Sequence, residues 1–97
     1  MDRQRIDKWL WHARMVRTRS DAARLVESGH VRVNGSRMTA AGHPVRRGDV
    51  LTVALDRSVR VVEVAAFSAR RGAAAPARAL YRDMAAAPSS EATVSGD

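Results

Sequence analysis

The chain has 97 residues, no cysteine and a formal net charge of +7. These residues accommodate one compact domain rather than two, and the lack of cysteine excludes disulfides and thiolate metal sites. The excess charge lies in one half, because residues 1–48 carry eleven basic and four acidic side chains, whereas residues 49–97 carry six of each. One face of the protein is therefore expected to meet a polyanionic partner.

The sequence contains no run of about 20 apolar residues, so no membrane span is predicted. The apolar stretch Trp9-Leu10-Trp11 is flanked by charged residues and a histidine, which argues against a signal peptide. We therefore expect a cytoplasmic protein that does not act at a membrane.

The first predicted element is an amphipathic helix over residues 6–16. Its apolar residues recur at the spacing of one helix face: Ile6, Trp9, Leu10 and Ala13. Trp9 belongs to that face and is predicted to lie in the core, whereas Trp11 falls outside it by more than a quarter turn. For Trp11 we favour packing beneath the C-terminal extension, with stacking on a nucleic-acid base as the alternative.

A second helix is predicted after a short basic link. Thr18 is suited to cap its start, and Asp21 stands where a capping-box residue reaches back to the cap. Its predicted buried face consists of Ala22, Leu25 and Val26. Gly29 is the residue type preferred just after a helix end, so the helix is expected to end near Ser28.

Strands follow, because the apolar period changes from 3.6 to 2. Val31 and Val33 alternate with polar residues, and Asn34-Gly35 predicts a tight turn. Further strands are predicted over residues 50–55 and 59–66. The expected fold class is α+β, with two N-terminal helices packed on a small, mostly antiparallel sheet.

The composition shifts to Ala, Arg, Gly and Pro after Phe67, which divides the chain into three expected parts. Residues 1–67 form the domain, residues 68–87 form an extension, and residues 88–97 form a disordered tail. The extension is predicted to contain a short helix over residues 77–86. The apolar residues that this helix would bury are Leu80, Tyr81 and Met84.

Basic residues gather where the second helix is predicted to begin. A helix start offers unpaired backbone N–H groups and a partial positive charge, which together suit a phosphate. Arg17 and Arg19 flank this point, and Thr18 and Ser20 add hydroxyl donors. The first helix and the first strand are expected to add six more contacts: Arg5, Lys8, Arg14, His30, Arg32 and Asn34. Such a surface would hold structured RNA by shape and charge. For His30, a plain surface position is nearly as well supported as RNA contact.

Asp7 is an acid inside this basic site. We interpret it as orienting a neighbouring arginine or lysine, because no second carboxylate, nucleophile or base accompanies it as catalysis would require. The three histidines lack the spacing of metal ligands. We therefore expect no catalytic residue, no metal and no cofactor, and a protein that is not an enzyme.

Four spaced motifs in this order resemble the RNA-binding domain named after small-subunit ribosomal protein S-four. They are Arg5-Ile6-Asp7-Lys8, Thr18-Arg19-Ser20-x-Ala22, Gly29-His30-Val31-x-Val33-Asn34-Gly35 and Val45-x-x-Gly48-Asp49. The resemblance covers about residues 5–53. More narrowly, Asp7-Lys8-Trp9-Leu10-Trp11 and the segment from Arg71-Gly72 to Leu80-Tyr81 are similar to the bacterial fifteen-kilodalton heat-shock protein family.

The resemblance implies the αL RNA-binding fold, with an RNA face made by the flank of the first helix, residues 17–20 and residues 30–34. It adds Arg37 as a contact, although Ser36 stands where family members often place a basic residue. It also implies binding to ribosomal RNA or tRNA on large ribosomal subunits carrying a stalled nascent chain. Such a protein would act in ribosome recycling or rescue under stress. We expect the protein to be a monomer.

Two other functional classes stay open. Two adjacent helices with a short link also occur in helix-turn-helix DNA-binding proteins, but Asp21 and Glu27 on the exposed face of the second helix would meet phosphates. Weak DNA binding through backbone charge is compatible with the net charge. The chain is also compatible with an accessory RNA-binding subunit of an RNA-modifying enzyme.

Overall fold

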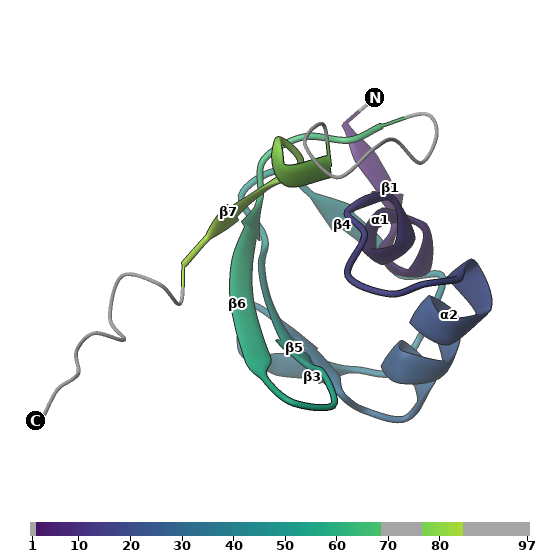
Figure 1. Cartoon of the computed structure of the whole chain (residues 1–97). Helices are drawn as coiled ribbons and strands as arrows, with labels where there is room; N and C mark the ends of the chain where they lie inside the picture. The colour runs from purple at the N-terminus through teal and green to yellow at the C-terminus, as the bar shows by residue number, and fades with distance from the viewer. Residues whose placement is uncertain (1, 69–76, 85–97) are drawn as a thin grey trace, which may run out of the picture.

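The computed structural model of the chain describes residues 2–68 and 77–84 (Figure 1). The tail predicted over residues 88–97 lies outside the described residues, as does most of the extension predicted over 68–87. In chain order, the elements of the described part are β1 (Arg3–Arg5), α1 (Ile6–His12), α2 (Arg19–Glu27), β2 (Val31–Val33), β3 (Ser36–Met38), β4 (Pro44–Arg46), β5 (Val50–Ala54), β6 (Val59–Val64) and β7 (Tyr81–Asp83).

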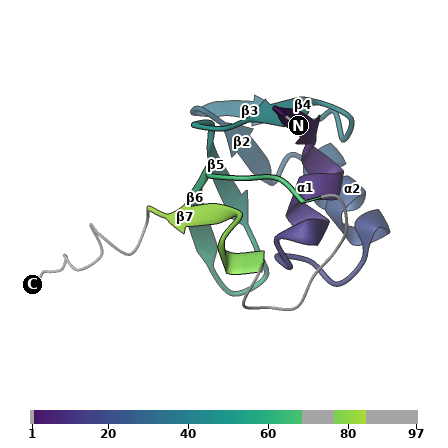
Figure 2. The same cartoon turned by 90° about the horizontal axis from the view of Figure 1, so that it is seen from above.

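The strands form two sheets. The larger one has the order β3-β2-β5-β6-β7, and every neighbouring pair in it is antiparallel. The smaller one is a two-stranded antiparallel ribbon of β1 and β4. Figures 1 and 2 show the large sheet along one side of the molecule and the two helices along the other. The predicted α+β fold of two helices and a small antiparallel sheet is thus confirmed.

The hydrophobic core lies between the helices and the large sheet. Ile6, Trp9 and Leu10 of α1 are fully buried, as the spacing of the apolar residues predicted. On the sheet side, the inward residues of β2 and β5 face them, because Val31 pairs with Val53 in a register that buries alternate residues. The Trp9 indole also lies edge-on to Tyr81, with ring centroids 6.5 Å apart.

The chain that leaves β6 is held against α1 and β1 by three buried side chains. Gln4 Nε2 donates to the backbone oxygen of Ser68 at 2.9 Å, and His12 Nδ1 lies 3.0 Å from the same oxygen. Trp9 Nε1 donates to the backbone oxygen of Ala66 at 3.0 Å. His12 is 1% exposed, so this histidine is a structural residue of the core. We call Gln4, Trp9 and His12 the exit clasp.

Helix α1 ends at His12, earlier than the predicted residue 16. Arg14 adopts a left-handed conformation with φ of 61°, and its backbone N–H donates to Trp11 O at 3.0 Å. The N–H of Met15 donates to Leu10 O at 3.1 Å, which completes a Schellman ending. The apolar spacing continues through this ending, and an arginine stands where glycine is usual. The periodicity alone therefore overestimated the length of the helix.

The helix predicted over residues 77–86 is wrong for its central part. Only Ala77 and Arg78 are helical, and Tyr81–Asp83 form β7 at the edge of the large sheet. Leu80 is buried as predicted, but Met84 is 39% exposed. The open edge of β6 supplies backbone partners for this segment, and pairing with it outweighs the helix propensity of its residues. Residues 85 and 86 lie outside the described part.

Trp11 is half-buried and packs against the hydrophobic core. Its ring centroid lies 5.3 Å from that of His12, at an interplanar angle of 37°. Packing was the favoured interpretation of this residue, and the structure agrees with it. The extension was predicted over residues 68–87, of which residues 69–76 and 85–87 lie outside the described part, so the packing of Trp11 beneath it stays a prediction.

Candidate nucleic-acid interface

Asp7 joins the end of β1 to the start of α2. Its carboxylate is buried at 4% side-chain exposure and accepts from Arg5 Nε at 3.1 Å and Arg5 Nη2 at 3.0 Å. It also accepts from the Lys8 backbone N–H at 2.7 Å, and Arg19 Nε lies 3.9 Å from its Oδ2. The hydrogen bond to Asp7 raises the pKa of the Arg5 guanidinium above its ordinary value. Asp7 therefore holds two guanidinium groups whose outer faces stay open, because Arg5 is 55% and Arg19 43% exposed.

The start of α2 is capped by a side chain as the sequence predicted. Thr18 has an extended backbone, and its Oγ1 accepts from the Asp21 N–H at 3.0 Å. The carboxylate of Asp21 accepts from Arg24 Nη2 at 3.4 Å, one turn further along the helix, so it serves Arg24 rather than the cap. Arg17, Thr18, Arg19 and Ser20 are all exposed at this helix start.

The β2–β3 hairpin has the tight turn predicted by Asn34-Gly35. Both residues are left-handed, with φ of 52° and 88°. Asn34 Oδ1 accepts from the Val50 N–H at 2.9 Å, and its Nδ2 donates to Asp49 Oδ1 at 3.2 Å. The other Asp49 oxygen accepts from the Arg46 N–H at 2.9 Å. The Asn34 amide thus ties the hairpin to the β4–β5 turn.

Two arginines face each other across this hairpin. Arg32 and Arg37 are directly opposed in the register of β2 and β3, and both are exposed. Arg32 Nη1 donates to the backbone oxygen of Gly35 at 3.4 Å. Arg37 lies over Gly29, the left-handed residue after α2. The carboxyl end of a helix carries partial negative charge, which suits a guanidinium at this point.

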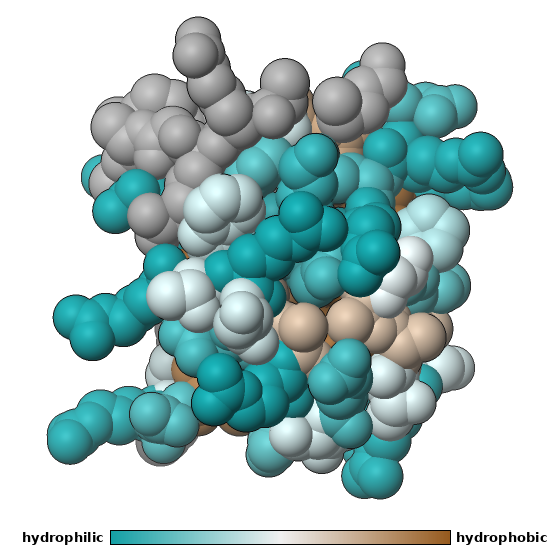
Figure 3. All heavy atoms as spheres, turned by 90° about the vertical axis from the view of Figure 1, so that its right-hand side faces the viewer, coloured by the Kyte–Doolittle hydropathy of each residue, from teal (hydrophilic) through white to brown (hydrophobic). Residues whose placement is uncertain are grey.

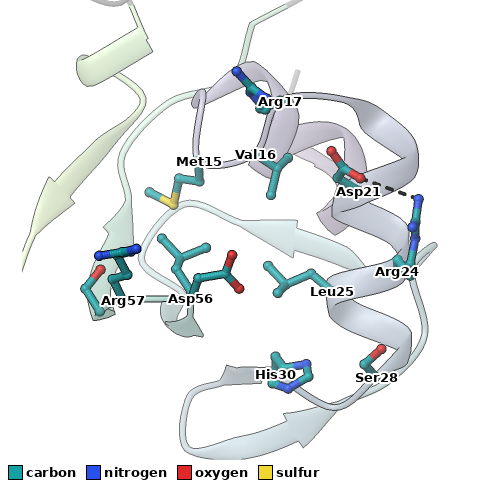
Figure 4. Close-up of a pocket in the computed structure, with 12 residues that line it drawn as sticks. Met15, Val16, Arg17, Asp21, Arg24, Leu25, Ser28, His30, Asp56 and Arg57 are labelled. Carbon is teal, nitrogen blue, oxygen red and sulfur yellow. Dashed lines mark hydrogen bonds and ion pairs between the residues drawn. The ribbon is translucent and has the colours of Figure 1, made fainter.

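A groove separates α2 from the link between β5 and β6 (Figure 4). Its volume is about 720 Å³, and its lining includes apolar side chains from Met15, Val16, Leu25 and Leu55. Arg17 stands at the end beside the α1–α2 link, and His30 lines the end beside β2. The sequence alone did not indicate that the β5–β6 link, residues 55–58, lines a groove. The sheet topology is what places this link opposite α2.

The predicted site residues therefore fall into two groups. The first comprises the residues in contact with Asp7 and those at the start of α2: Arg5, Asp7, Lys8, Arg17, Thr18, Arg19 and Ser20. The second lies on or next to the β2–β3 hairpin: His30, Arg32, Asn34 and Arg37. Arg14 is exposed just after the end of α1. Figure 3 shows that the face bearing α2 is mostly hydrophilic, with long side chains projecting at its edges.

The described residues show neither a metal-binding cluster nor a membrane-spanning helix. Within residues 2–68 and 77–84, no group of three or more histidine, aspartate or glutamate side chains has the arrangement of a metal site. Among the helices of this part, none has both the length and the apolar character needed to span a membrane.

Comparison with known proteins identifies the domain and its relatives. Residues 4–51 match the S4 domain, the S-four-type domain of the sequence analysis. A heat shock protein 15 homolog from Aeromonas salmonicida is 39% identical over 79 residues, which cover 81% of this chain and 59% of that protein. Heat shock protein 15 of Escherichia coli K12 is 37% identical over 81 residues, which cover 84% and 60% respectively. The chain thus spans about three fifths of the length of these relatives.

The fold is also similar to a solved structure over nearly its whole length. The trimeric structure of heat shock protein 15 from Vibrio cholerae superposes with a TM-score of 0.83 at 34% sequence identity. The aligned region covers 92% of this chain and 89% of that one. Sequence and structure agree, and the chain belongs to the heat shock protein 15 family.

Proposed function

We propose that this chain binds structured RNA through the basic surface around the start of α2 and the β2–β3 hairpin. The observation that carries the proposal is the Asp7 contact, because one buried carboxylate holds Arg5 and Arg19 side by side with their outer faces exposed. Fixing two guanidinium forks before binding reduces the entropy lost when they bind phosphate. Membership of a family that carries an S4 domain supports the same conclusion.

The mode of binding is recognition of the phosphate backbone and its shape. Arginine forks match phosphate oxygens, and the hydroxyls of Thr18 and Ser20 add further donors beside Arg17 and Arg19. The major groove of an RNA helix is too deep and narrow for side chains to read, so contacts of this kind suit folded RNA. The protein acts as a binding module without catalysis, and residues 1–67 contain every contact that we assign to it.

We propose further that the RNA is ribosomal RNA or tRNA on the large ribosomal subunit. In this proposal the protein recognises subunits that still carry a stalled nascent chain, and it acts in recycling or rescue under stress. The heat shock name of the relatives and the polyanionic partner expected from the charge distribution support this assignment. Sedimentation of the tagged protein through sucrose gradients of stressed cells tests it. Migration with small subunits or with neither subunit would contradict it.

The RNA-binding surface is tested directly with the double variant Arg17→Ala/Arg19→Ala. Both side chains are exposed, so the fold should be retained, while RNA affinity falls and the slope of log K against log salt decreases by about two. The charge-matched control is Arg78→Gln/Arg82→Gln, which removes two exposed arginines from the other end of the chain. Equal affinity and slope in the two double variants would refute the proposed surface. A DNA duplex of the same length is the competitor that tests the DNA-binding alternative.

The sequence predicts a monomer, and this prediction is independent of RNA binding. Light scattering coupled to size-exclusion chromatography measures the mass of the free protein and of its complex with RNA. A mass of one chain in both cases would agree with the prediction. A mass of three chains would instead match the trimeric structure of the Vibrio cholerae relative.

A further inference from the structure

The ribbon of β1 and β4 carries arginines on one outward face. In its register Arg3 is directly opposite Arg46, and Gln4 is opposite Val45. Gln4 and Val45 point inward and are buried, whereas Arg3, Arg5 and Arg46 are exposed. Because side chains alternate along a strand, these three arginines share the outward face of the ribbon.

The Arg3–Arg46 pair places two like charges at the shortest range a sheet allows. Directly opposite residues in an antiparallel pair have Cβ atoms about 4.5–5.5 Å apart, and like charges there are destabilising. Neither guanidinium forms an ion pair within residues 2–68 and 77–84. The nearby Asp49 carboxylate is engaged by the backbone N–H of Arg46 and by the Asn34 amide. The repulsion is thus left for a ligand to relieve.

Some arginines elsewhere in the described chain have acidic partners. Three of them lie within 3.4 Å of an acidic side chain: Arg24 with Asp21, Arg60 with Asp83 and Arg82 with Glu63. The only other directly opposed arginines in the described strand pairs are Arg32 and Arg37, which belong to the proposed RNA surface. Directly opposed arginines therefore occur on the β2–β3 hairpin, which belongs to that surface, and on the β1–β4 ribbon.

The ribbon is also connected to the Asp7 contact. Arg5 is two residues beyond Arg3 on the same face of β1, so their backbones are about 7 Å apart along the strand. Arg5 is fixed by Asp7, which also reaches Arg19. The ribbon itself is anchored by the Ile6 N–H, which donates to His43 O at 2.8 Å. Arg5 thus belongs both to the outward face of the ribbon and to the Asp7 contact at the start of α2.

We propose that Arg3 and Arg46 form a second phosphate-binding site, which receives the backbone of the same RNA that binds at the start of α2. This inference rests on the proposed function and extends its surface to residues that the sequence motifs do not include. Two opposed forks can converge on the oxygens of a phosphate, and binding neutralises the charges that repel each other in the free protein.

The test is a salt series of RNA affinities with a fluorescein-labelled RNA stem-loop, read by fluorescence anisotropy. Arg3→Gln/Arg46→Gln should bind roughly tenfold more weakly than the unaltered chain, since two charge-assisted hydrogen bonds are lost. The salt slope should fall by about two. Its thermal midpoint should stay the same or rise, because the variant also removes the repulsion. Arg3→Lys/Arg46→Lys should retain most of the salt slope, since the charges remain.

Two results would overturn the inference. One is an affinity and slope equal to those of Arg78→Gln/Arg82→Gln, the charge-matched control. The other is a loss of affinity that comes with a lower thermal midpoint and is not restored by lysine. If the inference alone fails, Arg17→Ala/Arg19→Ala still weakens binding. If the proposed function fails, the unaltered chain shows no salt-dependent RNA binding at all.

Discussion

Arg37 of β3 covers Gly29, the residue that follows α2: a Cβ added to Gly29 would stand 3.4 Å from Cδ of Arg37. Gly29 has a φ of 82°, and its N–H donates to Val26 O at 3.0 Å in the helix ending. One glycine thus meets two needs, since it ends the helix in a left-handed conformation and leaves room for an arginine of the proposed RNA surface.

Gly29→Ala should therefore destabilise the fold by about 1 kcal/mol or more, because alanine is strained at this φ. Urea unfolding followed by circular dichroism measures the effect. Gly42→Ala is the matched control, since a Cβ there would meet Arg5 Cζ at an ordinary 3.6 Å and no left-handed φ is required. Equal stability of the two variants would contradict the account of Gly29.

Asp7→Asn separates two effects that have opposite signs. Removing a negative charge from a basic surface should by itself tighten RNA binding, whereas releasing Arg5 and Arg19 should weaken it. We expect weaker binding, together with a loss of about 1–3 kcal/mol of stability from the disturbed buried hydrogen bonds. Asp21→Asn, which alters an exposed acid, is the control and should not weaken binding. Tighter RNA binding by Asp7→Asn would contradict the proposed role of Asp7 in orienting the two arginines for RNA.

The sequence predicts Asn34 as an RNA contact, but its amide oxygen and nitrogen both bond within the protein, so we expect it to act through the hairpin instead. Asn34→Ala should cost about 2 kcal/mol, because it loses the bonds to Val50 and Asp49 and strains a left-handed residue. Asn34→Gly removes the amide but tolerates the φ of 52°, so it should cost less. Thermal unfolding gives the order of stabilities. Under conditions where both variants are fully folded, RNA affinity should change little, and a large loss would make the amide a direct contact.

Trp9→Phe should destabilise the protein by about 2–4 kcal/mol. The smaller ring leaves a cavity beside Tyr81 and removes the donor for the buried Ala66 carbonyl. Val59→Thr, at a side chain that is 59% exposed, should change stability by no more than about 0.5 kcal/mol. Urea denaturation of both variants measures these changes, since a shift of the midpoint at a constant m-value reports a change in stability.

RNA binding should vary little between about pH 7 and pH 9 at fixed ionic strength, because arginine stays charged there. The pKa of Arg5 is raised by its hydrogen bond to Asp7, so the stability linked to this group is fully present below its unfolded pKa and is lost only as the pH rises through the higher folded pKa, well above this range. Affinities measured across this range, with salt held constant, test the expectation. A steep fall toward pH 9 would implicate another group in binding.

Local sequence rules predicted the parts of the fold whose determinants lie close together in the chain. The cap at Thr18, the helix ending at Gly29 and the turn at Asn34-Gly35 each depend on a few consecutive residues. The end of α1 was missed because Arg14 takes the left-handed position that glycine usually fills. The strand β7 was missed because its formation depends on the distant edge of β6.

The sequence predicted which residues belong to the candidate site, but it did not predict how they contact one another. Arg5, Asp7 and Arg19 were all expected at the site, but their contact depends on how β1 and α2 meet. The opposed pair of Arg3 and Arg46 could not be predicted, because β1 and β4 each bury a single residue, Gln4 or Val45, and so show no alternating apolar pattern. Register across strands is a tertiary property, and it decides which charges become neighbours.

The exit clasp sets the size of the smallest fragment that can fold. The region matching the S4 domain ends at residue 51, yet Trp9 and His12 inside it bind carbonyl groups at positions 66 and 68. A fragment cut at residue 51 would leave these buried polar groups without partners, would cut β5 after its second residue and would remove β6, its neighbour in the large sheet. An autonomous unit must therefore continue past Ser68, and a transplanted RNA-binding module should be cut to that boundary.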